Sequence, residues 1–232
     1  MKYIYVAVAI TLMALSGFIG ITYLPSMFTG DGNVLNVYLL NEDGELVKEA
    51  TAKIDSVENS GYISISYEAI PDSLRDAYIN SDLVAIIEIL DSFIVRVPLA
   101  TSEDDGYIGY IIYKAKIIDV FKGGYSRGDI IHLISLGDID ESKSVLYTQS
   151  EIPYFNIGDT LIIFTSRMTP YPGDVYGRLL IKNFPDLYEV PFVGFKVEDG
   201  RLSLISPLSP GSNYVGMDME QFKEEVLPSL SI

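Results

Sequence analysis

The first pattern that could support chemistry is Gly124-Tyr125-Ser126-Arg127-Gly128, which matches the G-x-S-x-G motif of serine hydrolases. In those enzymes the motif forms a strained turn from a strand into a helix and presents the serine to a histidine base. Here the residues that follow, 129–134, are rich in isoleucine and favour a strand. The glycines therefore indicate a hairpin loop, and we expect no nucleophilic serine in it.

The chain contains one histidine, His132. A zinc site there would need oxygen ligands alone beside the imidazole, and a catalytic triad would have no alternative base. Strand alternation places His132 on the same face as Ile130 and Ile134. We therefore predict a packed histidine or one at a barrel rim, with a functional histidine as the alternative.

Three acidic clusters, at residues 42–45, 103–106 and 138–141, carry carboxylates near glycine. Carboxylate oxygens are ligands for calcium, although none of the clusters matches an EF-hand loop. Asp and Glu are also common in solvated turns. Calcium with a structural role is thus the one candidate cofactor, and no metal-binding or catalytic residue can be assigned. A glycosidase would need two carboxylates across a cleft, which the sequence does not identify.

Tyrosine is abundant, with 17 residues, while tryptophan is absent. The segment 168–176 places Tyr171, Asp174 and Tyr176 among prolines and a glycine. Tyrosine offers a large contact area with little loss of rotamer entropy. We therefore predict a protein-binding loop with these three residues in contact with the partner. The alternative is a proline-stiffened connection whose tyrosines lie back on the fold.

Residues 3–24 form an apolar run preceded by Lys2. A helix of about 20 residues is what the hydrocarbon core of a bilayer requires. The run predicts a single-pass anchor in the cytoplasmic membrane with the remainder of the chain outside. The alternative is a cleaved secretory signal with Ala14-Leu15-Ser16 as the cleavage site, which would give a secreted protein.

The chain is strongly acidic, with 16 Lys and Arg against 32 Asp and Glu and a net charge of −16. Such a surface repels phosphate, which excludes nucleic acid as an expected partner. The absence of cysteine excludes disulfides and a lipid-modified cysteine. Stability must then come from a hydrophobic core, which a chain of this length can form.

The elements that must position these residues are mainly strands. Short strands are predicted at 33–40, 45–54 and 62–67, with turns at 41–44 and 58–61. A short helix follows over 71–79. Pro71 lies near its start, and Asp72 or Ser73 is able to cap it.

Longer Ile- and Val-rich strands come next, several of them apolar on both faces and therefore buried. They cover 82–97, 107–121, 129–136 and 160–166, and a hairpin spans 190–205 around the Asp-Gly turn at 199–200. The chain ends with an amphipathic helix capped by Asp218. It presents Met219, Phe222 and Val226 on one face and is expected to stop at Pro228.

Three stretches match landmarks of a known family. They are NSDLVAIIEI at 80–89, YKAKIIDVFKG at 113–123 and FNIGDTLIIF at 155–164. They resemble three landmarks of the netrin-like modules, a family that includes the tissue inhibitors of metalloproteinases. In order, these landmarks are the opening strand after "SD", the strand ending "VFKG" and the "GD" turn into a strand ending in Phe.

This resemblance covers roughly residues 76–206 and implies an OB-type β-barrel. Those inhibitors place an N-terminal cysteine on the zinc of a protease. Since this chain has no cysteine, neither that mechanism nor its residues carry over.

Four regions are expected: an anchor or signal at 1–30, a β-rich extension at 31–70, an OB-like closed or partly open β-barrel at 71–215 and a C-terminal helix at 216–232. Whether the extension joins the barrel is open. The predicted function is a non-catalytic, membrane-tethered, extracytoplasmic module that binds another protein. The alternatives are a calcium-binding envelope or surface component and an extracytoplasmic hydrolase.

Overall fold

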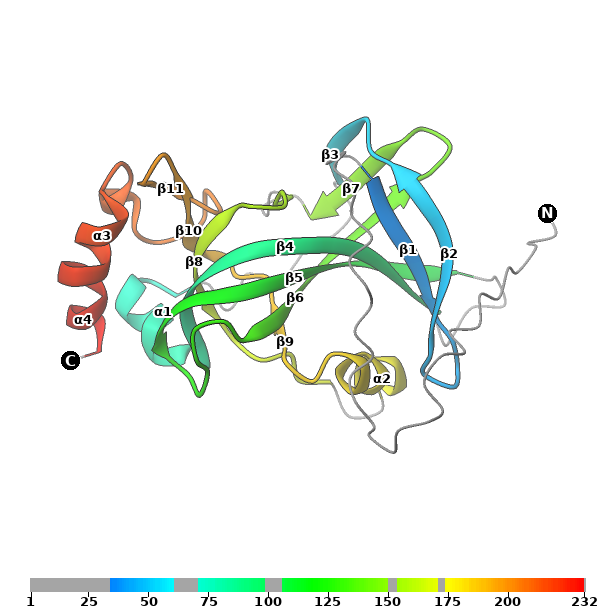
Figure 1. Ribbon diagram of the computed structural model, residues 1–232, viewed down its shortest axis with the longest axis horizontal. Coiled ribbons are helices and arrows are strands. Elements are labelled where there is room, and N and C mark those ends of the chain that lie inside the picture. The colour runs from blue at the N-terminus through cyan, green and yellow to red at the C-terminus, as the bar shows by residue number, and fades with distance from the viewer. Residues whose placement is uncertain (1–33, 61–70, 99–105, 150–153, 171–173, 232) are drawn as a thin grey trace.

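A computed structural model describes residues 34–60, 71–98, 106–149, 154–170 and 174–231 of the chain (Figure 1). The predicted anchor at 3–24, the predicted strand at 62–67 and Tyr171 lie outside these residues. Within them, no helix combines the length and the apolar character needed to cross a membrane.

Strands dominate the described residues, and eleven of them join into one strongly curled, half-barrel sheet (Figure 1). They are β1 (Val34–Leu40), β2 (Leu46–Lys53), β3 (Ser56–Ser60), β4 (Leu83–Pro98), β5 (Tyr107–Lys122), β6 (Ile130–Asp140), β7 (Val145–Gln149), β8 (Thr160–Thr165), β9 (Leu187–Glu189), β10 (Val193–Glu198) and β11 (Arg201–Leu204). The helices are α1 (Leu74–Asn80), α2 (Val175–Asn183), α3 (Met219–Gln221) and α4 (Leu227–Leu230), with a 3-10 turn at Ser212–Tyr214 and a π-helical turn at Phe222–Val226.

The two 16-residue strands β4 and β5 are long enough to cross the whole molecule, and irregular pairing allows them to curve. The register between them shifts at Val84/Ala85, at Ile86/Ile87 and between Ile89 and Asp91. Such bulges bend a strand and increase its twist. β4 therefore curls, pairing with β8 along its first half and with β1 along its second half.

Five strands complete a circuit of pairings. β4 pairs with β5, β5 with β6, and β8 with β4, all antiparallel. β9 pairs with β6 in parallel, with His132 opposite Leu187. Just after β8, Arg167 forms an antiparallel bridge with Tyr188 of β9. The sheet is thereby barrel-like around its middle.

The N-terminal extension joins this sheet. β1 pairs in parallel with β4 and antiparallel with β2, while β3 pairs in parallel with β7. The predicted turn at 58–61 is therefore wrong at residues 58–60, which belong to β3. The polar sequence SVENS favours a turn locally, but its hydrogen bonds to β7 place it in a strand.

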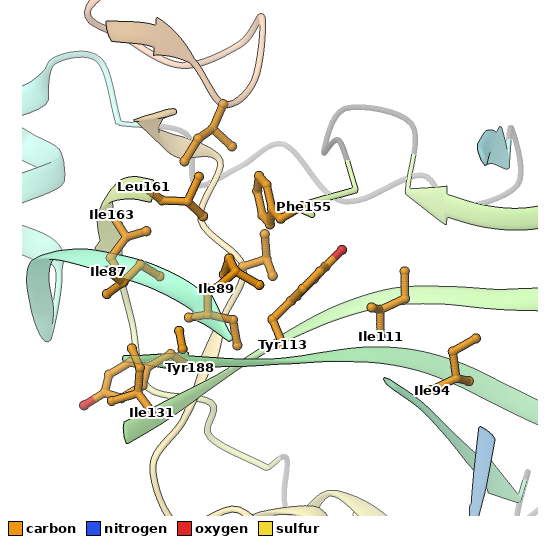
Figure 2. Close-up of a cluster of buried hydrophobic side chains, with 14 of the residues drawn as sticks. Ile87, Ile89, Ile94, Ile111, Tyr113, Ile131, Phe155, Leu161, Ile163 and Tyr188 are labelled. Carbon is orange, nitrogen blue, oxygen red and sulfur yellow. The ribbon is translucent and has the colours of Figure 1, made fainter. Parts of the chain in front are cut away.

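Three groups of buried side chains stabilise the sheet. The inner face holds the largest, which includes Ile87, Ile89, Ile111, Tyr113 and Phe155 (Figure 2). Strand alternation directs the remaining side chains outward, where helices cover two further groups.

We call these two groups the C-terminal cluster and the α2 cluster. The C-terminal cluster contains Leu74, Ala77, Val84, Ile86, Ile162, Phe164, Val193, Phe195, Leu202, Phe222, Val226, Leu227 and Leu230. The α2 cluster contains Leu40, Phe93, Val95, Val97, Ile112, Ile134, Leu180, Phe184 and Leu187. Helices α1, α3 and α4 gather at one end of the sheet, away from α2 (Figure 1).

The predicted helix before the barrel and the predicted C-terminal helix are both present, with one correction to the end of the second. Ser73 caps α1, accepting a hydrogen bond from the amide of Asp76, and Asp218 caps α3. Pro228 does not end the last helix, which continues to Leu230. A proline has no amide hydrogen to donate, and here it follows a π-helical turn in which the amide of Leu227 bonds to the carbonyl of Phe222.

Candidate functional site

A row of three titratable side chains crosses the outer face of the sheet. Asp91 of β4 lies opposite Lys114 of β5, which in turn lies opposite His132 of β6. Residues that pair in this way point to the same face, with Cβ atoms about 5 Å apart. The next row is Phe93, Ile112 and Ile134 of the α2 cluster. We call Asp91, Lys114 and His132 the polar row.

Asp91 is a partly buried carboxyl group beside the bulge in β4. Burial raises its pKa to about 6, and the backbone amide of Ser92 and the charge of Lys114 offset part of this effect. Its Oδ1 atom is buried without a hydrogen-bond partner among the described residues. Asp91 is thus a carboxyl group that changes charge near neutral pH.

His132 is the second member of the row with an unsatisfied atom. Its ring lies 5.0 Å from that of Phe184, which follows α2, and it shares its face with Ile134 as predicted. Burial lowers its pKa to about 4; the charge of Lys114 lowers it further, whereas Asp186 raises it. Its Nδ1 atom is buried without a hydrogen-bond partner among the described residues.

The polar row therefore places one cationic donor between a buried carboxylate oxygen and a buried imidazole nitrogen, and this nitrogen accepts a hydrogen bond in the tautomer that carries its proton on Nε2. Lys114 carries three N–H donors on a flexible four-carbon stem, and no ion pair within 4.0 Å involves it in the described part of the chain. A carboxyl group, an amine and an imidazole can move protons without a metal ion. Among the residues that the structure describes, no group of three or more His, Asp or Glu side chains is placed to hold one.

The loop with the G-x-S-x-G pattern joins β5 directly to β6, as the sequence predicts. Ser126 uses its backbone amide to bond Asp129. The hydroxyl of Tyr125 accepts hydrogen bonds from Arg167 and Tyr188 and donates one to Asp186 at 2.7 Å. Burial, with these bonds to Tyr188 and Asp186, raises the pKa of Tyr125. These hydrogen bonds hold the loop against β9, which gives Tyr125 a structural role.

Two of the acidic clusters fall within the described residues, one in a turn and the other at the end of β6. Residues 42–45 close the β1–β2 hairpin, where Asn41 accepts a hydrogen bond from the amide of Glu45. At 138–141, Asp138 and Glu141 both pair with Arg96 at 3.0 Å. The cluster at 103–106 lies outside the described residues except for Gly106.

The predicted partner-binding residues lie at the start of α2, a helix that was not predicted. Asp174 caps it by accepting a hydrogen bond from the amide of Gly177 at 2.8 Å. Tyr176 is partly buried and packs against the α2 cluster. Tyr110 of β5 packs against the same cluster, and the charge of Asp174 contributes to its raised pKa, after burial.

Apolar side chains near Tyr110 and Tyr176 in the chain are exposed. Val175, between Asp174 and Tyr176, is 62% exposed, and Ile108, two residues before Tyr110 on the same face of β5, is 36% exposed. We call Ile108, Tyr110, Val175 and Tyr176 the α2-end patch.

Asp91 and Lys114 were not predicted as candidate residues. The available signal was weak: each is a polar residue that interrupts a long apolar strand. Their relation to His132 depends on the register of three strands, which the sequence does not display. No protein-family model, curated protein or solved structure matches this chain. The resemblance to netrin-like modules therefore stays a prediction.

Proposed function

We propose that this protein is a non-catalytic, membrane-tethered β-barrel-like module that binds another protein outside the cytoplasmic membrane. The α2-end patch is the proposed contact surface. The observation that carries this proposal is that Tyr110 and Tyr176 pack against one cluster, while Ile108 and Val175, which lie near them in the chain, are exposed. Apolar and aromatic groups that remain accessible together are typical of the centre of a protein interface.

The proposed module has the strand arrangement of an OB-type barrel. In support, a circuit of pairings joins β4, β5, β6, β9 and the residues of β8 and just after it. OB folds are five-stranded, partly open barrels. In such folds, loops between strands contribute to binding surfaces. The α2-end patch would occupy a comparable place, since α2 lies between β8 and β9.

The proposed tether is the apolar run at 3–24, whose length suits a membrane span. The non-catalytic assignment is supported by the local roles of the residues that resembled a hydrolase motif. Ser126 lies in a loop between two strands, and the tyrosine next to it is bonded to Arg167, Asp186 and Tyr188.

Site-specific cross-linking tests this proposal. A photoreactive residue replacing Val175 in the full-length chain, in native membranes, is expected to capture one protein at a constant ratio. The double variant Ile108→Thr/Tyr176→Ala should reduce that capture at least tenfold, because it removes apolar contact area from the patch.

The matched control places the same photoreactive residue at Ile79, which is 57% exposed on α1 at the other end of the sheet. Equal capture of the same protein from both positions, or only self-cross-links from Val175, would contradict the proposed surface.

A further inference from the structure

The polar row contains the two buried side-chain atoms, Asp91 Oδ1 and His132 Nδ1, that have no hydrogen-bond partner in the described residues. Buried acceptors without donors are uncommon, because each loses its bonds to water and gains nothing in return. Both belong to one in-register row, and Lys114 is the residue between them. The two unsatisfied atoms and Lys114, which forms no ion pair among the described residues, therefore have a common explanation.

Lys114 can reach either acceptor. Its cross-strand neighbours on both sides are Asp91 and His132, with Cβ atoms about 5 Å away, and its stem is flexible. Asp91 and His132 lie on opposite sides of Lys114, so an ammonium group that moves toward one of them moves away from the other. The charge of Asp91 decides which is favoured, because the donor is charged in both bonds and only the ionised carboxylate adds the attraction between two opposite charges.

We propose that Lys114 is a shared hydrogen-bond donor that bonds Asp91 while this carboxylate is ionised and turns to Nδ1 of His132 once Asp91 is protonated. The proton comes from solvent and stays on Asp91, while the imidazole remains neutral in both states. The row then has two arrangements, selected by pH. This inference does not depend on the proposed function.

The surroundings of the row support a change near neutral pH. Burial already raises the pKa of Asp91 to about 6. Burial raises the pKa of the hydroxyls of Tyr38 in β1 and Tyr154 before β8, and the charge of Asp91 raises both further. Neither tyrosine changes charge in this range.

Other charged side chains also lie near the polar row. Asp186, before β9, faces His132. Glu88 and Lys116 form the adjacent row and pair with each other at 3.3 Å. The charged residues of α2, Arg178 and Lys182, are exposed. Lys114 is thus the cation that responds to Asp91.

The row lies at or next to contacts made by the elements that cover the outer face. Tyr38 of β1 packs edge-on against Phe93 at 5.6 Å, and His132 lies against Phe184 at the end of α2. A change in the partner of Lys114 would alter the electrostatic environment of both contacts. Protonation of Asp91 is in this way linked to the packing of β1 and α2.

The single histidine makes the test direct. Full-length protein with 15N-labelled histidine gives one pair of imidazole nitrogen signals, and these report whether Nδ1 accepts a hydrogen bond. Between pH 8 and 5 we expect the Nδ1 signal to move with a midpoint near 6, the value for Asp91, although His132 stays neutral. The Lys114→Met variant should abolish this movement.

Lys116→Met is the matched control, because it removes a lysine two residues away on the same face. It should leave the movement and its midpoint unchanged, and so should Asp186→Asn. Asp91→Asn should hold Nδ1 in its bonded state at every pH, and this variant decides the question if Lys114→Met does not fold.

Three results would overturn the proposal. The first is a constant Nδ1 signal in the wild-type protein. The second is movement that persists in Lys114→Met, as expected if an ordered water bridges the acceptors. The third is movement that persists in Asp91→Asn, which would assign the titration to another group.

Discussion

Asp91 is less favourable as a carboxylate in the folded protein than in the unfolded chain. Burial raises its pKa from an ordinary value of 3.8 to about 6. A carboxyl group with a raised pKa binds its proton more tightly when folded, so its contribution to stability grows as the pH falls from about 6 to 4. We expect Asp91→Asn to raise the melting temperature at pH 8 by roughly 2–4 °C and to give a smaller gain at pH 4.5.

Calorimetry on the full-length protein at pH 8, 6 and 4.5 measures this effect. Asp43→Asn is a suitable control, since Asp43 is exposed in the β1–β2 turn and should change the melting temperature little. If Asp91→Asn lowered the melting temperature at pH 8, the carboxylate would have to be stabilised by a contact that outweighs its burial.

The contribution of His132 to folding stability depends on pH in the opposite direction. Burial lowers its pKa from 6.5 to about 4, so the folded state resists a proton that the unfolded chain accepts, and stability falls as the pH drops from about 6.5 to 4. His132→Phe keeps an aromatic ring beside Phe184 and removes this titration. We expect its stability relative to the wild type to be higher at pH 4.5 than at pH 7.5.

Urea unfolding midpoints at the two pH values provide the comparison. Because Asp91 and His132 oppose each other over nearly the same range, Asp91→Asn should lose more stability on acidification than the wild type does. Parallel pH profiles for His132→Phe and the wild type would show that His132 does not titrate differently in the folded state.

The long strands could be predicted because their own residues specify them. The predicted strand at 82–97 is found at Leu83–Pro98, and that at 107–121 is found at Tyr107–Lys122. Runs of Ile and Val identify buried strands without reference to a partner. Short elements are not specified by their own residues in this way. β3 depends on β7, almost ninety residues later, and α2 gains its apolar contacts only against the sheet.

The polar row could be predicted only in part. Alternation places His132 on a face with Ile134, which the structure confirms. Its neighbours depend on register, and the register of β4 shifts between Ile89 and Asp91. A bulge moves the residues that follow it to the other face, so a regular strand would have directed Asp91 with Ile89 toward the core.

The C-terminal helix is expected to stabilise one end of the sheet through Phe222. This side chain is fully buried, 5.0 Å from the ring of Phe195 and 5.4 Å from that of Tyr214. Phe222→Ala should lower the free energy of unfolding by about 3–5 kcal/mol, because it removes buried apolar area and leaves a cavity. Denaturant unfolding measures the change. Val215→Ala, at a site that is 52% exposed, should stay within about 0.5 kcal/mol.

Arg96 connects three strands at the other end of the sheet. Its guanidinium pairs with Asp138 and Glu141 and bonds the carbonyl of Ile139, and Glu49 of β2 lies 3.7 Å away. Arg96→Met keeps the apolar stem but leaves three carboxylates close together. We expect a loss of about 2–3 kcal/mol, reduced at high salt, where repulsion between the carboxylates is screened.

Unfolding of Arg96→Met at low and high ionic strength checks this prediction. Lys53→Met is the control, because its pair with Asp55 is largely exposed, with 67% and 56% of the two side chains accessible. Such surface pairs contribute little. Equal losses for the two variants would mean that the Arg96 network adds no more than a surface ion pair.

At the scale of the whole molecule, the apolar run at 3–24 and the net charge of −16 predict a chain anchored in lipid with an acidic domain in water. We expect the full-length protein to stay with membranes after alkaline extraction, at an intact mass of 25.7 kDa. Leu12→Arg/Leu15→Arg should release it or prevent insertion, because each arginine at the centre of a span costs about 2.5–3.5 kcal/mol. Soluble protein of lower mass, cut near Ala14-Leu15-Ser16, would instead support a cleaved signal and contradict the tether.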